Sequence, residues 1–218
     1  MRIIVTGANG ALGSVVAGHL EKAGAQVARI VRNSDRAAPG LFLCDDLADA
    51  SLAGQILSSA IEWLGGIDGL VNIAGGFTWE KIEQGSPATW QHMFTLNVQT
   101  ALVCSMSVLP HLKAGGSIVN VGAAAAGNAG AGMGAYAAAK SGVARLTESL
   151  AAEVKMRGIR VNAILPGTID TPKNRQDMPK ADHQQWTDPA AIAEAIHFLL
   201  SDSSRAITGA LIPVTNAV

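Results

Sequence analysis

The chain has 218 residues, of which 49% are hydrophobic and 15% are charged, and its formal net charge is −1 at pH 7. This composition excludes a disordered chain, and the lack of a basic cluster argues against nucleic acid as the main partner. No apolar run approaches a membrane span and no signal-peptide pattern precedes the first apolar segment, so we expect a cytoplasmic protein without membrane partners. Cys44 and Cys104 lie in apolar segments, which is typical of buried thiols in a reducing compartment.

Apolar runs and helical segments alternate along the whole chain. The apolar runs predict strands at 3–5, 26–31, 41–43, 69–73, 117–121, 159–164 and 210–214. The segments between them predict helices at 13–23, 49–64, 87–112, 135–157 and 189–200. This alternation predicts an α/β fold in a single domain over residues 1–218, with one doubly wound parallel sheet covered by helices on both faces.

Loops that follow the strands are the expected place of the functional site. Open parallel sheets bind ligands beyond the carboxyl ends of their strands. We therefore expect the site in the loops 7–13, 75–85, 122–135 and 166–187, and we expect 166–187 to contact the substrate. The Ala/Gly-rich loop 122–135 is either disordered or packed tightly against a ligand, and its place between a buried strand and a long helix favours packing.

A glycine-rich turn, T-G-A-N-G-A-L-G at 6–13, joins the first strand to the first helix. Small residues let the backbone approach a pyrophosphate, and the helix N-terminus supplies N–H donors and positive potential. At the first strand-to-helix junction of a βαβ unit, such a turn predicts a dinucleotide site. The residues that we expect to bind the cofactor here are Gly7, Asn9, Gly10, Ala11, Leu12 and Gly13.

The second strand ends at Val31-Arg32, with Arg36 nearby. At this point NAD-binding proteins of this type carry an acid that binds the ribose hydroxyls. An arginine can instead pair bidentately with a 2′-phosphate. Arg32 therefore favours NADP(H) over NAD(H), although a solvated Arg32, or one stacked on adenine, would leave NAD(H) as the cofactor.

Tyr136 is the only tyrosine of the chain, and Lys140 follows it by four residues. Residues at this spacing share one helix face. Beside a nicotinamide, a phenol can donate a proton, and we expect the ammonium of Lys140 and the oxidised ring to lower the pKa of Tyr136. The alternative is a pair on a helix surface without a chemical role.

Together these motifs resemble the short-chain dehydrogenase/reductases over essentially the whole chain. The resemblance also rests on Asp46-Leu47, on N-I-A-G at 72–75, on Asn97 and on Pro166-Gly167. It implies a Rossmann-type fold, oxidoreductase activity, and a proton relay of Tyr136, Lys140 and Asn97. In this relay Asn97 bends its helix and holds a water, while Tyr136 and Lys140 also bind the cofactor, Lys140 through the nicotinamide ribose hydroxyls. The further cofactor contacts that it implies are Asp46, Leu47, Asn72, Ala74, Gly75, Pro166, Gly167, Ile169 and Thr171. Asn72 could instead only tie neighbouring backbones together.

The loop D-T-P-K-N-R-Q-D-M-P-K-A-D-H-Q-Q-W-T at 170–187 is similar to the equivalent loop of the dihydropteridine reductases. Those enzymes also carry alanine where most of the family has its catalytic serine, as this chain does at Ala123. The resemblance implies hydride transfer to a quinonoid dihydropterin, which has no carbonyl to polarise. The expected substrate contacts are Phe77, Ala123 and Trp186, although each aromatic ring could instead only pack its loop.

Two alternative functions stay open at this point. One is a carbonyl or 3-oxoacyl reductase that works without the serine, and the other is a non-catalytic NADP(H)-binding sensor. The histidines share no ligand spacing, so we expect no metal. The family resemblance implies a homodimer or homotetramer formed through helices 87–112 and 135–157.

Overall fold

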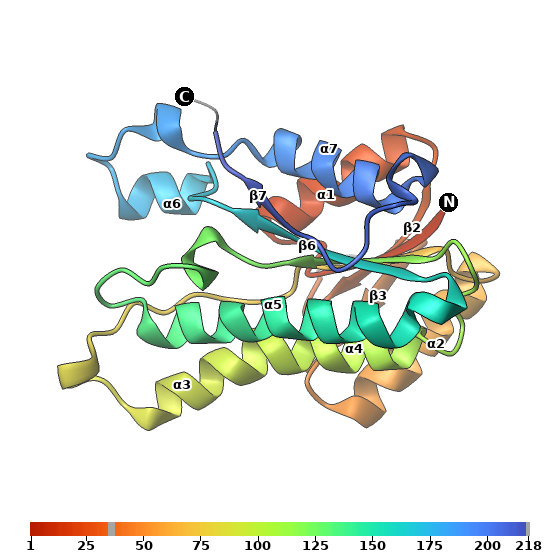
Figure 1. Cartoon of the computed structure of the whole chain (residues 1–218), viewed down its shortest axis with the longest axis horizontal. Helices are drawn as coiled ribbons and strands as arrows, with labels where there is room; N and C mark the ends of the chain where they lie inside the picture. Colours follow the sequence, from red (N-terminus) through yellow and green to blue (C-terminus); the bar gives the residue numbers. More distant parts are fainter. Residues whose placement is uncertain (35–37, 217–218) are drawn as a thin grey trace.

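The computed structural model describes residues 1–34 and 38–216, which form three layers around a parallel sheet (Figure 1). The sheet has seven strands in the order β3-β2-β1-β4-β5-β6-β7, and every neighbouring pair is parallel. Its strands are β1 (Arg2–Thr6), β2 (Gln26–Val31), β3 (Leu41–Leu43), β4 (Gly69–Asn72), β5 (Ser117–Val121), β6 (Arg160–Pro166) and β7 (Leu211–Val214). The order reverses between β1 and β4, which is where such sheets bind ligands.

Helices cover both faces of the sheet (Figure 1). On one face, α1 (Ala11–Lys22) packs against α7 (Pro189–Leu200). The other face carries α2 (Ala50–Leu64), α4 (Thr100–Val108) and α5 (Gly134–Val154), with α3 (Pro87–Phe94) packed on α5. The short helix α6 (Pro172–Asp177) lies beyond the end of β6. The predicted α/β fold in one domain is confirmed.

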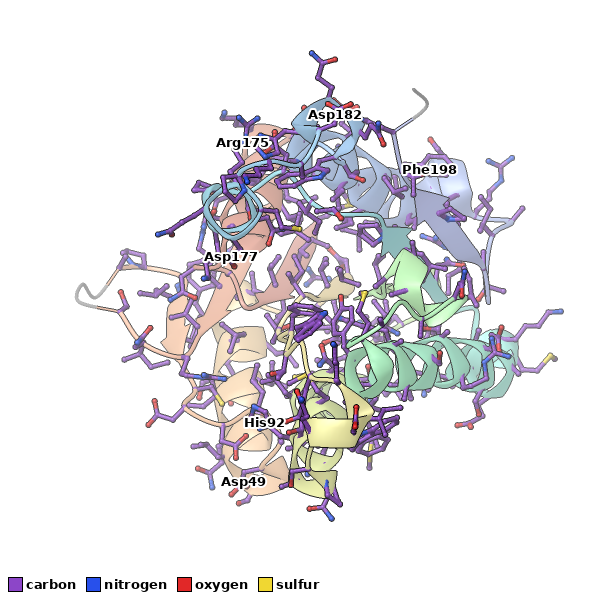
Figure 2. All side chains as sticks on the ribbon, turned by 90° about the vertical axis from the view of Figure 1, so that its left-hand side faces the viewer. Asp49, His92, Arg175, Asp177, Asp182 and Phe198 are labelled. Atoms are coloured by element: carbon purple, nitrogen blue, oxygen red, sulfur yellow. The ribbon has the colours of Figure 1, made fainter. Side chains whose placement is uncertain are left out.

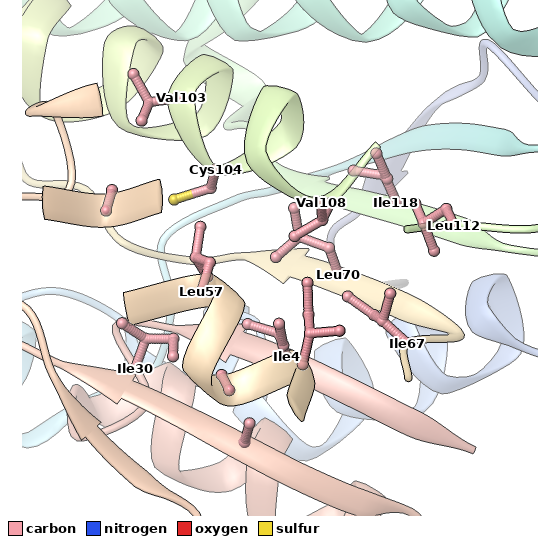
Figure 3. Packing of buried hydrophobic residues seen from close by; sticks show 14 of the residues in the cluster. Ile4, Ile30, Leu57, Ile67, Leu70, Val103, Cys104, Val108, Leu112 and Ile118 are labelled. Carbon is pink, nitrogen blue, oxygen red and sulfur yellow. The ribbon is translucent and has the colours of Figure 1, made fainter. Parts of the chain in front are cut away.

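Two apolar cores lie on the two sides of the sheet, because successive strand residues point to opposite faces. In β1, Ile4 contributes to the core under α2, α4 and α5, where Leu57 and Leu70 also lie (Figure 3). Its neighbours Ile3 and Val5 contribute to the core under α1 and α7. Strands that are buried on both faces read as continuous apolar runs, which is why the sequence pattern located them.

Two helical segments differ from the prediction. The expected helix 87–112 is interrupted by a π-helical turn at Thr95–Gln99, and α4 ends at Val108. Pro110 explains the early end, because proline has no N–H to donate to the carbonyl four residues earlier. The loop 166–187 contains α6, whose Thr171-Pro172 start repeats the N-cap and proline pattern that identified α3 at Ser86.

Both cysteines are buried free thiols. Burial raises the pKa of Cys104 to about 12, so its thiol stays protonated near neutral pH. Within residues 1–34 and 38–216, no group of three or more His, Cys, Asp or Glu side chains could hold a metal ion. In the same ranges, no helix is long and apolar enough to cross a membrane.

Candidate active site

In the turn between β1 and α1, the backbone leaves no room for a side chain at Gly7 or Gly13. Gly7 has a φ of 66°, which favours glycine, and its carbonyl oxygen accepts a 3.0 Å hydrogen bond from the N–H of Gly10. A β-carbon on Gly13 would overlap that same carbonyl oxygen. A β-carbon on Gly7 would lie 3.0 Å from Cα of Ala74. The turn is therefore pressed against the end of β4, at the point where the strand order reverses.

The N-terminus of α1 fits a phosphate group. Its N-cap is Gly10, and no side chain caps it. By contrast, side chains cap α2, α3 and α7 at Asp49, Ser86 and Asp188. The first N–H groups of a helix need partners, and a pyrophosphate supplies acceptors of the right charge. The residues present in this turn thus fit a dinucleotide.

Asn9 connects this turn to the end of β2. Its Nδ2 donates a 3.0 Å hydrogen bond to the carbonyl oxygen of Asn33, the residue that follows Arg32. Arg32 is exposed at this edge, and Arg36 lies outside the described residues. Asp46, which is also exposed, accepts a 2.8 Å hydrogen bond from the N–H of Ala48, so its carboxylate shapes the turn after β3.

Asn72 is buried at the end of β4, and its side chain faces the protein interior. Nδ2 is within hydrogen-bonding distance of Asn120 Oδ1 at 2.9 Å, Ser105 Oγ at 3.1 Å and the Ala101 carbonyl at 3.4 Å. This amide therefore ties β4 to β5 and α4, which is the structural alternative considered for it. Its Oδ1 atom is buried and has no hydrogen-bond partner among the described residues.

Tyr136 and Lys140 lie one turn apart on α5. Nζ of Lys140 is 5.8 Å from the centroid of the Tyr136 ring and donates a 2.9 Å hydrogen bond to the carbonyl oxygen of Val121. Lys140 is only 6% exposed, and burial lowers its pKa to about 8. Burial raises the pKa of Tyr136 to about 12. In the protein alone, desolvation thus outweighs the expected lowering of the phenol pKa by Lys140.

Asn97 holds the loop that follows β4. Its Oδ1 accepts a 3.2 Å hydrogen bond from the N–H of Gly76, and its Nδ2 donates a 3.1 Å bond to the carbonyl of the same residue. Nδ2 also lies 3.0 Å from the carbonyl of Met93, four residues earlier on α3, and Asn97 itself lies in the π-turn. A β-carbon on Gly75 would lie 2.6 Å from Asn97 Oδ1 and 3.6 Å from Lys140 Nζ. The backbone of Gly75 is therefore close to both polar groups of the expected relay.

The three expected substrate residues occupy different environments. Phe77 is 57% exposed, and its ring packs edge-to-face on Tyr136 with centroids 5.0 Å apart. Ala123 is buried two residues after Val121, in a segment without hydroxyl groups, G-A-A-A-A at 122–126. Trp186 is only 8% exposed and packs against the ring of His183 at 4.3 Å, which is the loop-packing alternative.

The loop 166–187 folds back on itself after β6, whose last residue is Pro166. The N–H of Asp170 donates to the Thr187 carbonyl at 2.9 Å, and the N–H of Thr187 donates to the Thr168 carbonyl at 2.7 Å. Thr171 caps α6 through its hydroxyl, and Ile169 packs on the α1/α7 core. Gly167 lies beside the Thr187 hydroxyl, since a β-carbon there would be 3.3 Å from Oγ1.

Elements distant in sequence surround the carboxyl ends of the strands. Figure 2 shows Arg175 and Asp177 of α6 on one side and His92 of α3 on the other. Sequence reasoning missed two contributors, Gly76 and Val121, which act through their backbone groups. Backbone contacts leave no signal in residue type, apart from the small size of Gly76.

The chain is similar in sequence to known oxidoreductases. The sequence profile of a family described as Enoyl-(Acyl carrier protein) reductase matches residues 7–216. The 2-(S)-hydroxypropyl-CoM dehydrogenase 3 of Xanthobacter autotrophicus is 30% identical over 97% of this chain and 94% of its own length. The 3-oxoacyl-[acyl-carrier-protein] reductase of Vibrio cholerae is 30% identical over 99% of this chain and 96% of its own length.

A solved structure of a similar protein has the same fold. A short chain dehydrogenase from Burkholderia cenocepacia, crystallised in complex with NADP, superimposes with a TM-score of 0.87 and 27% identity. The alignment covers 98% of this chain and 95% of that chain. The chain therefore belongs to the short-chain dehydrogenase/reductase family of oxidoreductases.

Proposed function

We propose that this protein is an NAD(P)H-dependent reductase that transfers hydride to a small planar substrate, a quinonoid dihydropterin. The observation that carries the proposal is the pair of partly buried Tyr136 and buried Lys140 next to a segment, 122–126, that offers no hydroxyl group. The pair supplies a proton donor, while the missing hydroxyl disfavours substrates that build negative charge on oxygen.

The cofactor would be held by the glycine turn and by the residues around it. The N–H groups of residues 11–13 would bind the pyrophosphate, Gly7 would keep the turn close to β4, and Asn9 would keep it close to β2. Adenine would lie beside Asp46 and Leu47, and the nicotinamide carboxamide beside Ile169 and Thr171. The remaining members of the proposed set are Asn72, Ala74, Gly75, Pro166 and Gly167. When bound, the reduced dinucleotide supplies the hydride.

Tyr136 would donate the proton. With a pKa near 12 in the protein alone, its phenol is protonated at neutral pH, which is the form that a reductase needs. A phenol this weak gives up its proton only where positive charge stabilises the phenolate. Lys140, protonated below its pKa of about 8, places that charge beside the ring. Asn97 would position Gly75 and Gly76 against Lys140.

The substrate ring would lie over Ala123 and Phe77. Losing one donor to a developing oxyanion typically costs about 10²–10³ in rate, so a ketone would react poorly at Ala123. The conjugated nitrogens of a quinonoid dihydropterin accept hydride and proton without forming an alkoxide. The likeness of the loop 170–187, including Trp186, to the dihydropteridine reductases supports the same substrate, with 166–187 as the substrate loop of a single domain over residues 1–218.

We propose NADP(H) as the preferred cofactor, with NAD(H) as the alternative. Arg32 follows β2 directly, at the edge to which Asn9 ties the glycine turn. An arginine there suits a 2′-phosphate. The Burkholderia relative that was crystallised with NADP supports this preference.

A second candidate is a carbonyl or 3-oxoacyl reductase. The 30% identity to the Vibrio cholerae 3-oxoacyl reductase, over nearly the whole chain, favours it. Its difficulty is Ala123, because such a substrate develops charge on an oxygen that nothing in 122–126 can stabilise through a side-chain hydroxyl.

Oxidation of NADPH or NADH with quinonoid dihydropterin, measured beside a panel of ketones and 3-oxoacyl thioesters, tests the proposal. We expect dihydropterin turnover that collapses in Tyr136→Phe. Fast ketone reduction without dihydropterin turnover would contradict the proposal and favour the second candidate. Tight cofactor binding without turnover of any substrate would indicate a sensor.

We also propose that the protein forms a homodimer or homotetramer through the helices at 87–112 and 135–157. The exposed apolar residues Trp90, Phe94, Leu102 and Met106 follow one another at multiples of four along α3 and α4. A groove of about 580 Å³ runs beside Trp90 and Phe94, and Ala135, Ala138 and Ala139 of α5 line it. Sedimentation of the wild type and of Phe94→Glu tests this, and a monomeric wild type would refute it.

A further inference from the structure

The segment 77–81 has no regular secondary structure, yet both of its ends are anchored. At one end, Asn97 holds both backbone groups of Gly76. At the other end, Trp79 and Glu80 bind the loop 127–133. Phe77, whose ring packs on Tyr136, lies between these two anchors.

The second anchor is a contact between loops that lie about fifty residues apart in sequence. Nε1 of Trp79 donates a 3.1 Å hydrogen bond to the carbonyl oxygen of Ala131, and the N–H of Glu80 donates a 2.8 Å bond to the carbonyl oxygen of Gly132. We call these four residues the clasp. The clasp is open to solvent, since Trp79 is 56% exposed, so core burial does not explain its position.

The backbone of Gly132 packs against the indole of Trp79. Its φ is 75°, a conformation that favours glycine. A β-carbon on Gly132 would also overlap atoms Cε2 and Nε1 of Trp79. The indole therefore rests directly on the Gly132 backbone, and any side chain there would push it away. By contrast, a β-carbon on Gly130 would make only an ordinary 3.5 Å contact with Met133 Sδ.

We propose that Trp79 is a positioning residue that sets substrate specificity through Phe77. The clasp holds the Phe77 ring against Tyr136 before the substrate binds, so that the site accepts a flat ring system in preference to a branched substrate. This inference rests on the proposed reductase activity. A side chain that is already ordered does not have to be immobilised on binding, so the clasp contributes to substrate affinity and leaves cofactor affinity unchanged.

Trp79→Ala removes the indole, and Trp79→Phe keeps a ring on Gly132 but removes the N–H donor. We expect KM for dihydropterin to rise about tenfold in Trp79→Ala and about threefold in Trp79→Phe, since one hydrogen bond is a modest share of the contact. In both variants, kcat and the KM for NADPH should stay within about twofold of wild type. The hydrogen bonds of the clasp involve none of the expected relay residues Tyr136, Lys140 and Asn97. Trp63→Phe, on α2, is the matched control and should change none of these values.

Gly132→Ala disrupts the same contact from the loop 127–133. It gives an independent test if the Trp79 variants fail to fold. We expect it to raise KM for dihydropterin as Trp79→Ala does, and the double variant should be no worse than either single one, because both remove the same contact. Gly130→Ala is its control. Additive effects of Trp79→Ala and Gly132→Ala would contradict a shared contact.

Amide hydrogen exchange tests the clasp without any substrate. The Glu80 N–H should lose protection in Trp79→Ala and keep it in Trp63→Phe. If the wild type reduces ketones and not dihydropterin, the proposed substrate is wrong, and KM is then measured with the ketone. Unchanged protection of Glu80 in Trp79→Ala overturns the proposal, as does lost protection with unchanged substrate KM.

Discussion

The glycine turn at 7–13 and the loops around Phe77 lie at the same edge of the sheet, but different interactions hold them in place. Backbone of neighbouring residues forms the turn, where Gly7 and Gly13 leave no room for a β-carbon. Side chains from distant segments form the other region, as in the contacts of Phe77 with Tyr136 and of Trp79 with Ala131. The cofactor end thus depends on close backbone packing, whereas the substrate end depends on contacts that single substitutions can change one at a time.

The largest effect is expected at the substrate end. Tyr136→Phe keeps the ring that packs on Phe77 and removes only the proton donor. We expect kcat to fall about 10³-fold, a typical loss for a general acid, and the Kd for NADPH to stay within about threefold. Stopped-flow turnover and fluorescence titration measure the two quantities. A kcat within tenfold of wild type would mean that another group donates the proton.

At the cofactor end, Gly13→Ala should be nearly as severe. The added methyl group overlaps the Gly7 carbonyl oxygen, so the turn must open. We expect a loss of about 3 kcal/mol in unfolding free energy together with weakened binding of NADPH and NADH alike. Gly18→Ala, in the same helix and with no atom within 4 Å of the new methyl group, is the control. Helix propensity predicts that Gly18→Ala gains roughly 0.5–1 kcal/mol.

Replacing Lys140 is expected to raise the stability of the fold and to abolish activity. Its pKa of about 8 in the folded protein is below the ordinary value of about 10.4, so folding disfavours the ammonium. This cost is fully present below pH 8 and disappears as the pH rises through the ordinary value. After subtracting the lost hydrogen bond to Val121, we expect Lys140→Met to be about 2 kcal/mol more stable than wild type at pH 7, and inactive.

Denaturant unfolding across the pH range checks this sign. The advantage of Lys140→Met over wild type should shrink between pH 8 and pH 10.4. An advantage that grows with pH would show that the buried ammonium stabilises the fold.

The smallest of these effects concerns cofactor choice. Arg32→Ala should raise KM for NADPH about tenfold, since one charge-assisted contact to the 2′-phosphate is lost. KM for NADH, which lacks that phosphate, should change less than about twofold in the same variant. Steady-state kinetics with both cofactors decide the matter, and equal effects on the two would refute the assignment of Arg32.

The two regions also differ in how far the sequence predicts them. Strands that are buried on both faces and the glycine turn follow from local patterns, and the structure has them at nearly the expected residues. No local pattern predicts the break at Asn97, which the family resemblance alone implies, because the amide there bonds to Gly76, 21 residues away, as well as to Met93. Trp186 shows the same limit, since residue type alone does not distinguish a ring that packs on His183 from one that faces a ligand.

The most direct test of the central claim is Ala123→Ser, which restores a hydroxyl to 122–126. If the site has adapted to a substrate that needs no oxyanion donor, kcat/KM for quinonoid dihydropterin should change less than about threefold, whereas that for ketones should rise about 10²-fold. Ketone reduction that is already fast in the wild type and does not respond to Ala123→Ser would contradict the account.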